Sequence, residues 1–219
     1  MEGSSVQYRI GIDAGGTKVA YGLFDADHAL VDRFQHATPI TADGPAFCDL
    51  VIESLHRLLQ KNNIGVDSLQ GIGICMPSFI LFDEGYVCMT SAMVNIRDFA
   101  MRDYLQEQLN VPVVLDNDSN VAALAEHRYG AGRGRRHMIY MATSTGIGSG
   151  LILERRAVSG QLRLGGRERS YADHPRRGDR LRMPQLRLLY VVGIWPLHSA
   201  AHPPHGAGTP DQHGARSGA

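Results

Sequence analysis

Apolar and polar positions alternate along the first part of the chain. Residues 8–14 and 18–25 are apolar runs with a period of two, joined by a short glycine turn, and residues 29–37 continue the pattern. Such alternation is typical of β-strands, whose side chains point in turn to the two faces of a sheet. The pattern therefore predicts three consecutive strands at the start of the fold.

After these strands, the spacing of apolar residues becomes that of helices interleaved with further strands. Apolar residues at every third or fourth position predict an amphipathic helix from Ala46 to Gln60. Alternation of strands and helices implies an α/β fold. The further predicted elements are a strand over 71–77, a helix over 96–109, a strand over 111–117, a helix over 119–130, and strands over 137–144 and 151–154.

Charge divides the chain near Glu154. Residues 1–154 hold 11 Lys and Arg against 18 Asp and Glu, whereas residues 155–219 hold 11 arginines and only four acidic residues. The second segment has no lysine, contains six of the ten prolines, and shows no comparable apolar period. We therefore expect 155–219 to be an atypical tail that is either disordered or read out of frame.

Properties of the whole sequence exclude several classes of protein. The formal net charge is zero, which gives no sign of a nucleic-acid partner or an acidic membrane surface. Three cysteines without a CxxC spacing argue against a disulfide framework and a zinc finger. No apolar run approaches the roughly 20 residues of a membrane span. We expect a cytoplasmic protein with no nucleic-acid partner and no membrane partner.

The hexapeptide Asp-Ala-Gly-Gly-Thr-Lys, which begins at Asp13, allows two interpretations. In the first, the glycines supply positive φ angles to a hairpin turn that Asp13 caps. In the second, the backbone N–H groups of Gly15, Gly16 and Thr17 face a phosphate, because no Cβ blocks its approach. Lys18 would then add positive charge, and Asp13 would hold Mg²⁺ through water. The hexapeptide alone does not decide between these interpretations.

A second turn of small residues, Thr-Gly-Ile-Gly-Ser-Gly over 145–150, lies between two predicted strands. It is either a plain hairpin or a second phosphate loop, and alone it does not distinguish the two. Two glycine turns, each followed by an apolar strand, favour a nucleotide whose phosphates are held from two sides of a cleft.

Polar residues gather where the predicted strand 111–117 meets the predicted helix 119–130. Asn117, Asp118 and Asn120 are residue types that suit a helix N-cap. A cap needs only one of them, and a further carboxylate at the carboxyl end of an α/β strand is a candidate general base. From the sequence, Asp118 is either part of the helix cap or a general base.

In this order and spacing, these stretches resemble the ROK family of sugar kinases over about residues 7–154. The resemblance implies an actin-like, RNase H-like ATPase fold, in which a mixed sheet has flanking helices, with the second lobe truncated. It implies that ATP and Mg²⁺ are bound by the first phosphate loop (Asp13, Gly15, Gly16, Thr17, Lys18) and the second (Thr145, Gly146, Gly148).

The same resemblance assigns the sugar site. Residues 71–78 resemble the family's sugar loop, except that Ser78 replaces the usual glycine, and Asn117 would bind sugar hydroxyls. Asp118 would be the catalytic base. The implied activity is ATP-dependent phosphorylation of a hexose, with glucose favoured over fructose, N-acetylhexosamine or allose. The family also includes repressors, which carry a helix-turn-helix before the first loop; here about seven residues precede it.

The resemblance also predicts how the chain is organised. Residues 1–130 would form the N-terminal kinase lobe, 131–154 the start of a second lobe, and 155–219 the atypical tail. Intact relatives tend to form homodimers, whereas the oligomeric state of this chain is not predicted. Family members continue with Ala-Gly-Glu-x-Gly-His and a zinc-binding cysteine cluster, but the tail contains no cysteine, so no structural zinc is expected. We therefore expect this chain to have little or no activity.

The tail can encode the missing motifs when each codon is read one base late. Residues 165–170 can then encode Ala-Gly-Glu-(Asn or Ser)-Gly-His, and residues 181–188 can encode Cys-Glu-Cys-Arg-Asn-Tyr-Gly-Cys. Residues 193–195 can encode Ala-Ser-Gly, which also resembles the family. An arginine-rich nucleic-acid arm is a weaker interpretation, because the arginines are scattered among prolines and apolar residues.

These matches predict a frameshift between about Glu154 and Gly165, in the gene or in its sequencing. Resequencing the DNA across codons 150–200 should reveal the shifted Glu-x-Gly-His and cysteine codons. An intact sense frame over 165–195 that lacks those shifted codons would contradict the prediction.

Overall fold

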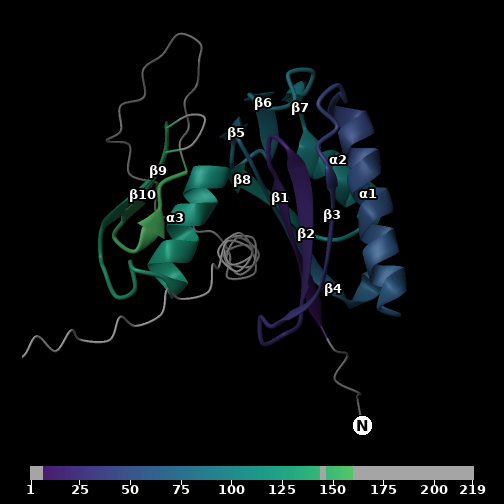
Figure 1. Ribbon diagram of the computed structural model, residues 1–219, viewed down its shortest axis with the longest axis horizontal. Coiled ribbons are helices and arrows are strands. Elements are labelled where there is room, and N and C mark those ends of the chain that lie inside the picture. The colour runs from purple at the N-terminus through teal and green to yellow at the C-terminus, as the bar shows by residue number, and fades with distance from the viewer. Residues whose placement is uncertain (1–6, 144–146, 160–219) are drawn as a thin grey trace, which may run out of the picture.

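A computed structural model describes residues 7–143 and 147–159 of the chain (Figure 1). The predictions made for Thr145, for Gly146 and for the tail from residue 160 onward lie outside the described residues.

A five-stranded mixed sheet forms the centre of the described N-terminal part of the chain (Figure 1). Three of its strands run parallel to one another, and the two at one side are antiparallel to their neighbours. This arrangement confirms the mixed sheet predicted from the sequence. In spatial order the strands are β3 (Leu30–Ala37), β2 (Lys18–Phe24), β1 (Tyr8–Ala14), β4 (Leu69–Met76) and β8 (Val113–Asn117).

Strands β1 and β2 lie inside the sheet and are buried along almost their whole length. Ile10 and Ile12 on β1 and Tyr21 and Leu23 on β2 have no exposed surface. The period of two found in the sequence therefore does not mark one buried and one exposed face in these two strands. The edge strand β3 of this sheet, in contrast, alternates between exposed and half-buried residues.

Helix α1 (Gly44–Lys61) packs with α2 (Met101–Leu109) on one face of this sheet (Figure 1). The carboxylate of Asp43 accepts a hydrogen bond from the backbone N–H of Ala46 (3.0 Å) and so caps the first turn of α1. The predicted helix over 46–60 is thus confirmed, slightly extended at both ends. None of the helices within 7–143 and 147–159 is long and apolar enough to cross a bilayer.

The predicted helix over 96–109 is correct only in its second half. Residues Arg97–Phe99 form β7, which pairs with β6 (Tyr86–Thr90), and β6 pairs with β5 (Ser78–Leu81). None of these three strands was predicted from the sequence. Their pairing is a tertiary contact that local apolar spacing does not reveal. Val87 lies opposite Phe99 and Met89 opposite Arg97, and Asp98, between the two paired residues of β7, has a positive φ of 49°.

A second, three-stranded sheet packs on α3 (Asp118–Tyr129), which the sequence predicted closely. Its strands are β9 (Met138–Thr143), β10 (Ile147–Leu153) and β11 (Arg156–Ala157). The glycine-rich segment expected to be a turn over 145–150 belongs to β10 from Ile147 onward. A Cβ atom at Gly148 would overlap the side chain of Ser119, and one at Gly150 would overlap Ala123. Glycine here allows β10 to lie directly against α3.

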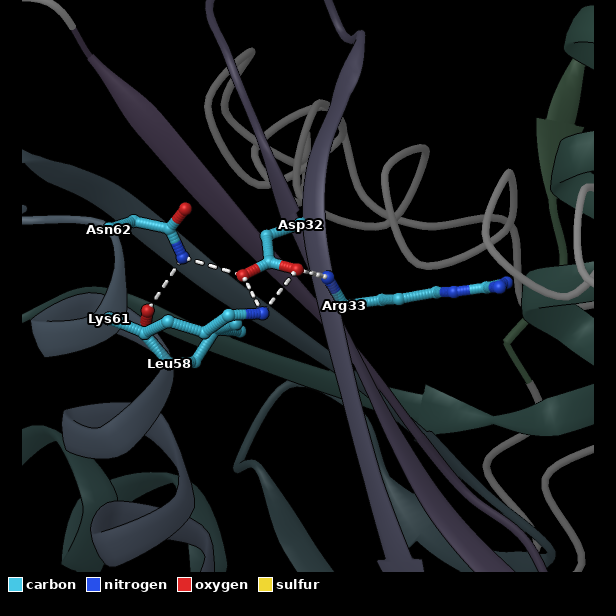
Figure 2. Close-up of polar contacts among 5 residues, drawn as sticks. All are labelled: Asp32, Arg33, Leu58, Lys61 and Asn62. Carbon is cyan, nitrogen blue, oxygen red and sulfur yellow. Dashed lines mark hydrogen bonds and ion pairs between the residues drawn. The ribbon is translucent and has the colours of Figure 1, made fainter.

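An acidic residue on β3 ties the edge of the first sheet to the end of α1 (Figure 2). Asp32 pairs with Lys61 (2.8 Å) and accepts a hydrogen bond from Asn62 Nδ2 (2.8 Å). The same Asn62 Nδ2 donates to the carbonyl of Leu58 (2.8 Å). The hydrogen bonds from Lys61 and Asn62, followed by one from the Arg33 backbone, lower the pKa of Asp32 to about 2.

Asp32→Asn should lower the free energy of unfolding at pH 7 by about 1 kcal/mol or less, because Lys61 is exposed and water screens the pair. The folded-state pKa lies below the unfolded value, so the stabilisation is present above about pH 4 and is lost as the pH falls through about 2. Urea unfolding at pH 7, 4 and 2.5 should show the difference shrinking. Asp67→Asn, at an exposed aspartate with no ion pair in the described part of the chain, is the control; a difference independent of pH would contradict this account.

Candidate active site

The carboxyl ends of the three parallel strands meet at one edge of the first sheet. In the register of these strands Asp13 on β1 lies beside Cys75 on β4, and Cys75 lies beside Asp116 on β8. Residues aligned across neighbouring strands share one face of a sheet. The register therefore gathers two carboxylates and a thiol where ligands bind in α/β folds.

Asp13 is half-buried, and the thiol of Cys75 donates a hydrogen bond to its Oδ1 (3.6 Å). Burial is the main cause that raises the pKa of Asp13, and this hydrogen bond opposes the rise. The charge of Asp118 raises the pKa further, and that of Lys18 lowers it. The fold thus brings Asp13, Lys18 and Asp118 within electrostatic reach of one another. Burial, together with the nearby carboxylates, raises the pKa of Cys75, which keeps it a thiol and a donor.

The loop between β1 and β2 is held in place by Thr38, a buried residue that directly follows β3. Thr38 donates its hydroxyl to the carbonyl of Gly15 (2.7 Å) and its N–H to the carbonyl of Thr17 (3.0 Å). The N–H of Gly15 donates to the carbonyl of Lys18 (3.0 Å), which closes the turn. The loop is therefore a fixed hairpin rather than a loose connection.

The glycines of this loop do not supply positive φ angles, contrary to the first interpretation of the hexapeptide. A Cβ atom at Gly16 would meet nothing closer than Ala92 at 3.8 Å, so the space above its backbone is open. Gly16 and Thr17 are exposed, and within the described residues their N–H groups have no hydrogen-bond partner. Two backbone donors beside Lys18 can thus meet an anion.

The first turn of α3 contains both an N-cap and a further carboxylate. Asn117 is the cap: its Oδ1 accepts from the N–H of Ser119 (2.9 Å), and its Nδ2 donates to the carbonyl of Ser78 (3.1 Å). Asp118 is the first helical residue, half-buried, and its Oδ1 accepts from the same N–H (2.7 Å). The positive end of the helix dipole stabilises a carboxylate at this position.

Asp116 has a structural role. It is buried and accepts hydrogen bonds from the N–H of Asn117 (2.7 Å), from Asn120 Nδ2 (3.0 Å) and from the hydroxyl of Ser159 (2.7 Å). Burial raises the pKa of Asp116, and these hydrogen bonds oppose the rise. Asp116 therefore anchors α3, whereas Asn117 caps it.

The remaining predicted site residues lie on either side of this turn. Ser78 is buried beside Asn117, and its hydroxyl donates to the carbonyl of Met76 (3.1 Å) rather than into open space. Gly148, at the start of β10, lies against Ser119, one residue from Asp118. The start of the second predicted phosphate loop, Thr145 and Gly146, is outside the described residues.

No group of three or more His, Cys, Asp or Glu side chains within the described ranges is arranged to hold a metal ion. Mg²⁺ in nucleotide sites is usually bound by one or two carboxylates together with phosphates and water. A half-buried Asp13 next to an open glycine backbone suits that mode, in which the nucleotide supplies the other ligands.

Three residues that build the site were not identified from the sequence. Cys75 contacts Asp13 only because two parallel strands align, and Ser159 reaches Asp116 across 43 positions of sequence. Thr38 follows an edge strand and carries no motif. The run Asp116-Asn117-Asp118 was a usable signal for Asp116, because three such residues exceed what one cap requires.

Comparison with known proteins relates this geometry to characterised relatives. The ROK family model matches residues 9–166. The chain is 31% identical over 148 residues to a glucokinase of Halalkalibacterium halodurans, covering 68% of this chain and 44% of that protein. It is 32% identical over 158 residues to the xylose repressor of Bacillus spizizenii, covering 70% and 40%.

A solved structure has the same fold. The crystal structure of a ROK family glucokinase from Streptomyces griseus in complex with glucose and AMPPNP matches with a TM-score of 0.60 at 28% identity, covering 70% of this chain and 47% of that one. This match confirms the predicted actin-like ATPase fold. The chain spans less than half the length of each of these relatives.

Proposed function

The chain belongs to the ROK family, and we propose on that basis that it carries the sugar-binding and catalytic lobe of an ATP-dependent hexose kinase. The observation that carries the proposal is the division of roles at the start of α3. Asp116 is buried and hydrogen-bonded within the fold, and Asn117 carries an amide that cannot act as a base, whereas Asp118 lies half-buried near Asp13 and Lys18. A carboxylate in that position suits proton abstraction from a sugar hydroxyl.

In the proposed reaction the oxygen of a sugar hydroxyl attacks the γ-phosphorus of ATP, and the bond to the β-phosphate oxygen breaks. Asp118 accepts the proton of the attacking hydroxyl. Bound ATP and Mg²⁺ supply the phosphoryl group and part of the neutralising charge. The residues of the chain chiefly position the reactants, so placement and electrostatics provide most of the rate enhancement.

The proposed contacts follow the geometry of the two sides of the site. The N–H groups of Gly16 and Thr17, with Lys18, face the phosphates, and Asp13 binds Mg²⁺ through water. Gly15 fixes the loop by its own hydrogen bond to Lys18. We also propose, from the resemblance alone, that the second predicted phosphate loop, Thr145, Gly146 and Gly148, binds the phosphates.

On the sugar side, Asn117 binds hydroxyl groups of the substrate beside the backbone of Ser78. Glucose is the favoured substrate, because two of the relatives are glucokinases and one of them is in complex with glucose. Fructose, N-acetylhexosamine and allose are the alternatives. The hydroxyl of Ser78 is used internally, so Ser78 contributes its backbone rather than its side chain to the site.

A sugar-responsive repressor is the second candidate, favoured by the similarity to the xylose repressor. A folded fragment that binds sugar without catalysis is the third. Calorimetry with hexoses and ATP distinguishes a binding fragment from a chain with no site, and phosphoryl transfer distinguishes a kinase from both other candidates.

The test compares the chain as it stands with a version whose reading frame is restored after residue 160. The restored protein should form glucose 6-phosphate from ATP and glucose, and Asp118→Asn should lower its kcat about 10²–10⁴-fold, the usual contribution of a general base. Asp67→Asn, at an exposed position remote from the site, is the matched control. The unrestored chain should release ADP at a rate close to background.

Two outcomes would count against this account. A restored, folded protein that binds glucose but transfers no phosphoryl group would support the repressor instead. Glucose-dependent ADP release by the unrestored chain at ordinary kinase rates would show that the second lobe is not needed.

A further inference from the structure

A small pocket lined mostly by basic side chains lies at the end of α3 opposite to Asp118. It has a volume of about 220 Å³ and is lined by His127, Arg128, Arg133, Gly134, Arg135 and Arg155. His127 lies nine residues beyond Asp118 on the same helix, which corresponds to about 14 Å along the axis. The pocket is therefore separate from the candidate active site.

The charge around this pocket is strongly unbalanced. Residues 126–156 contain six arginines and two glutamates. Both glutamates are engaged elsewhere: Glu126 accepts from the N–H of Ala131 (3.0 Å), and Glu154 pairs with Arg136. Arg133, Arg135 and Arg155 form no ion pair within the described part of the chain.

The backbone that carries these three arginines is fixed by hydrogen bonds. The N–H of Arg133 donates to the carbonyl of Gly130 (3.2 Å), and that of Arg135 donates to Gly132 (3.1 Å). The N–H of Arg155 donates to the carbonyl of Arg136 (2.8 Å), which joins the β10–β11 turn to the loop after α3. His127 Nε2 contacts the carbonyl of Arg135 (2.7 Å). The guanidinium groups thus project from a frame that exists before any ligand binds.

The turn that presents Arg155 has an unfavourable backbone. Glu154 and Arg155 both have positive φ angles, of 49° and 62°. Two-residue hairpins with positive φ at both positions favour Asn-Gly, and a long side chain at the second position is strained there. Arg155 therefore stands where glycine would be the more stable choice.

We propose that this pocket binds a small anion that carries phosphoryl groups. Guanidinium groups bind phosphate oxygens through paired hydrogen bonds, and four arginines around one concave surface suit such a ligand. The volume lies below the roughly 300–1,000 Å³ of sites for drug-sized ligands, which favours phosphate, pyrophosphate or the phosphate group of a sugar ester. The site is independent of the proposed kinase reaction.

Calorimetric titration of the full chain with sodium pyrophosphate at constant ionic strength tests the proposal. Inorganic phosphate and glucose 6-phosphate in parallel titrations distinguish free phosphates from a sugar ester. Arg133→Gln, Arg135→Gln and Arg155→Gln combined should weaken pyrophosphate binding about tenfold or more. Arg33→Gln, at an exposed arginine on β3 whose side chain extends away from the Asp32 cluster (Figure 2), should leave the affinity within about twofold of wild type.

Two further variants separate this site from the active site and from loss of folding. Lys18→Gln removes a basic group of the proposed ATP site, so pyrophosphate bound there should weaken, whereas the binding that the triple arginine variant loses should persist. Arg155→Gly should raise the melting temperature, since glycine suits a φ of 62°, and should still weaken pyrophosphate binding. The proposal is overturned if the triple variant and Arg155→Gly keep wild-type affinity, if Lys18→Gln abolishes the binding, or if the wild type shows no saturable binding.

Discussion

The parallel register of β1, β4 and β8 is the constraint on which the candidate active site depends. It sets Asp13, Cys75 and Asp116 side by side where the three strands end. A slip of one residue in any pair would turn the aligned side chains to the opposite face of the sheet. Buried apolar residues on β1 and β4, among them Ile12 and Ile74, hold that register, because the same slip would remove them from the core. The core and the site are therefore specified together.

Within this frame, neighbouring polar residues have different tasks because their environments differ. Asp116 is buried and satisfied by three donors, so it stabilises the start of α3 and the segment that follows β11. Asn117 closes the helix and reaches Ser78. Asp118 is only half-buried and shares its donor with the cap, which leaves it accessible to a substrate hydroxyl. The sequence has three polar residues in a row here, and their hydrogen bonds determine the different task of each.

The sequence predicted the elements that local patterns encode and missed those that depend on distant pairing. Helices α1 and α3 and the five strands of the main sheet follow from apolar spacing, caps and glycine stops. Strands β5, β6 and β7 form by pairing with one another, and β7 occupies residues whose local spacing favoured a helix. The motifs at Asp13 and Asp118 were found because their residue types exceed what a turn or a cap requires. Cys75, Thr38 and Ser159 join the site only through tertiary contacts, so no local pattern identified them.

The central claim, that a hexose binds at the start of α3 beside Asp118, is tested most directly by NMR of the ¹⁵N-labelled chain titrated with glucose. The account predicts saturable changes at the backbone amides of Ser78, Asn117 and Asp118. The basic pocket at the far end of α3, represented by Arg133 and Arg135, should show none. Changes absent from Asn117 and Asp118 at saturating glucose, in a chain that retains its fold, would contradict the claim.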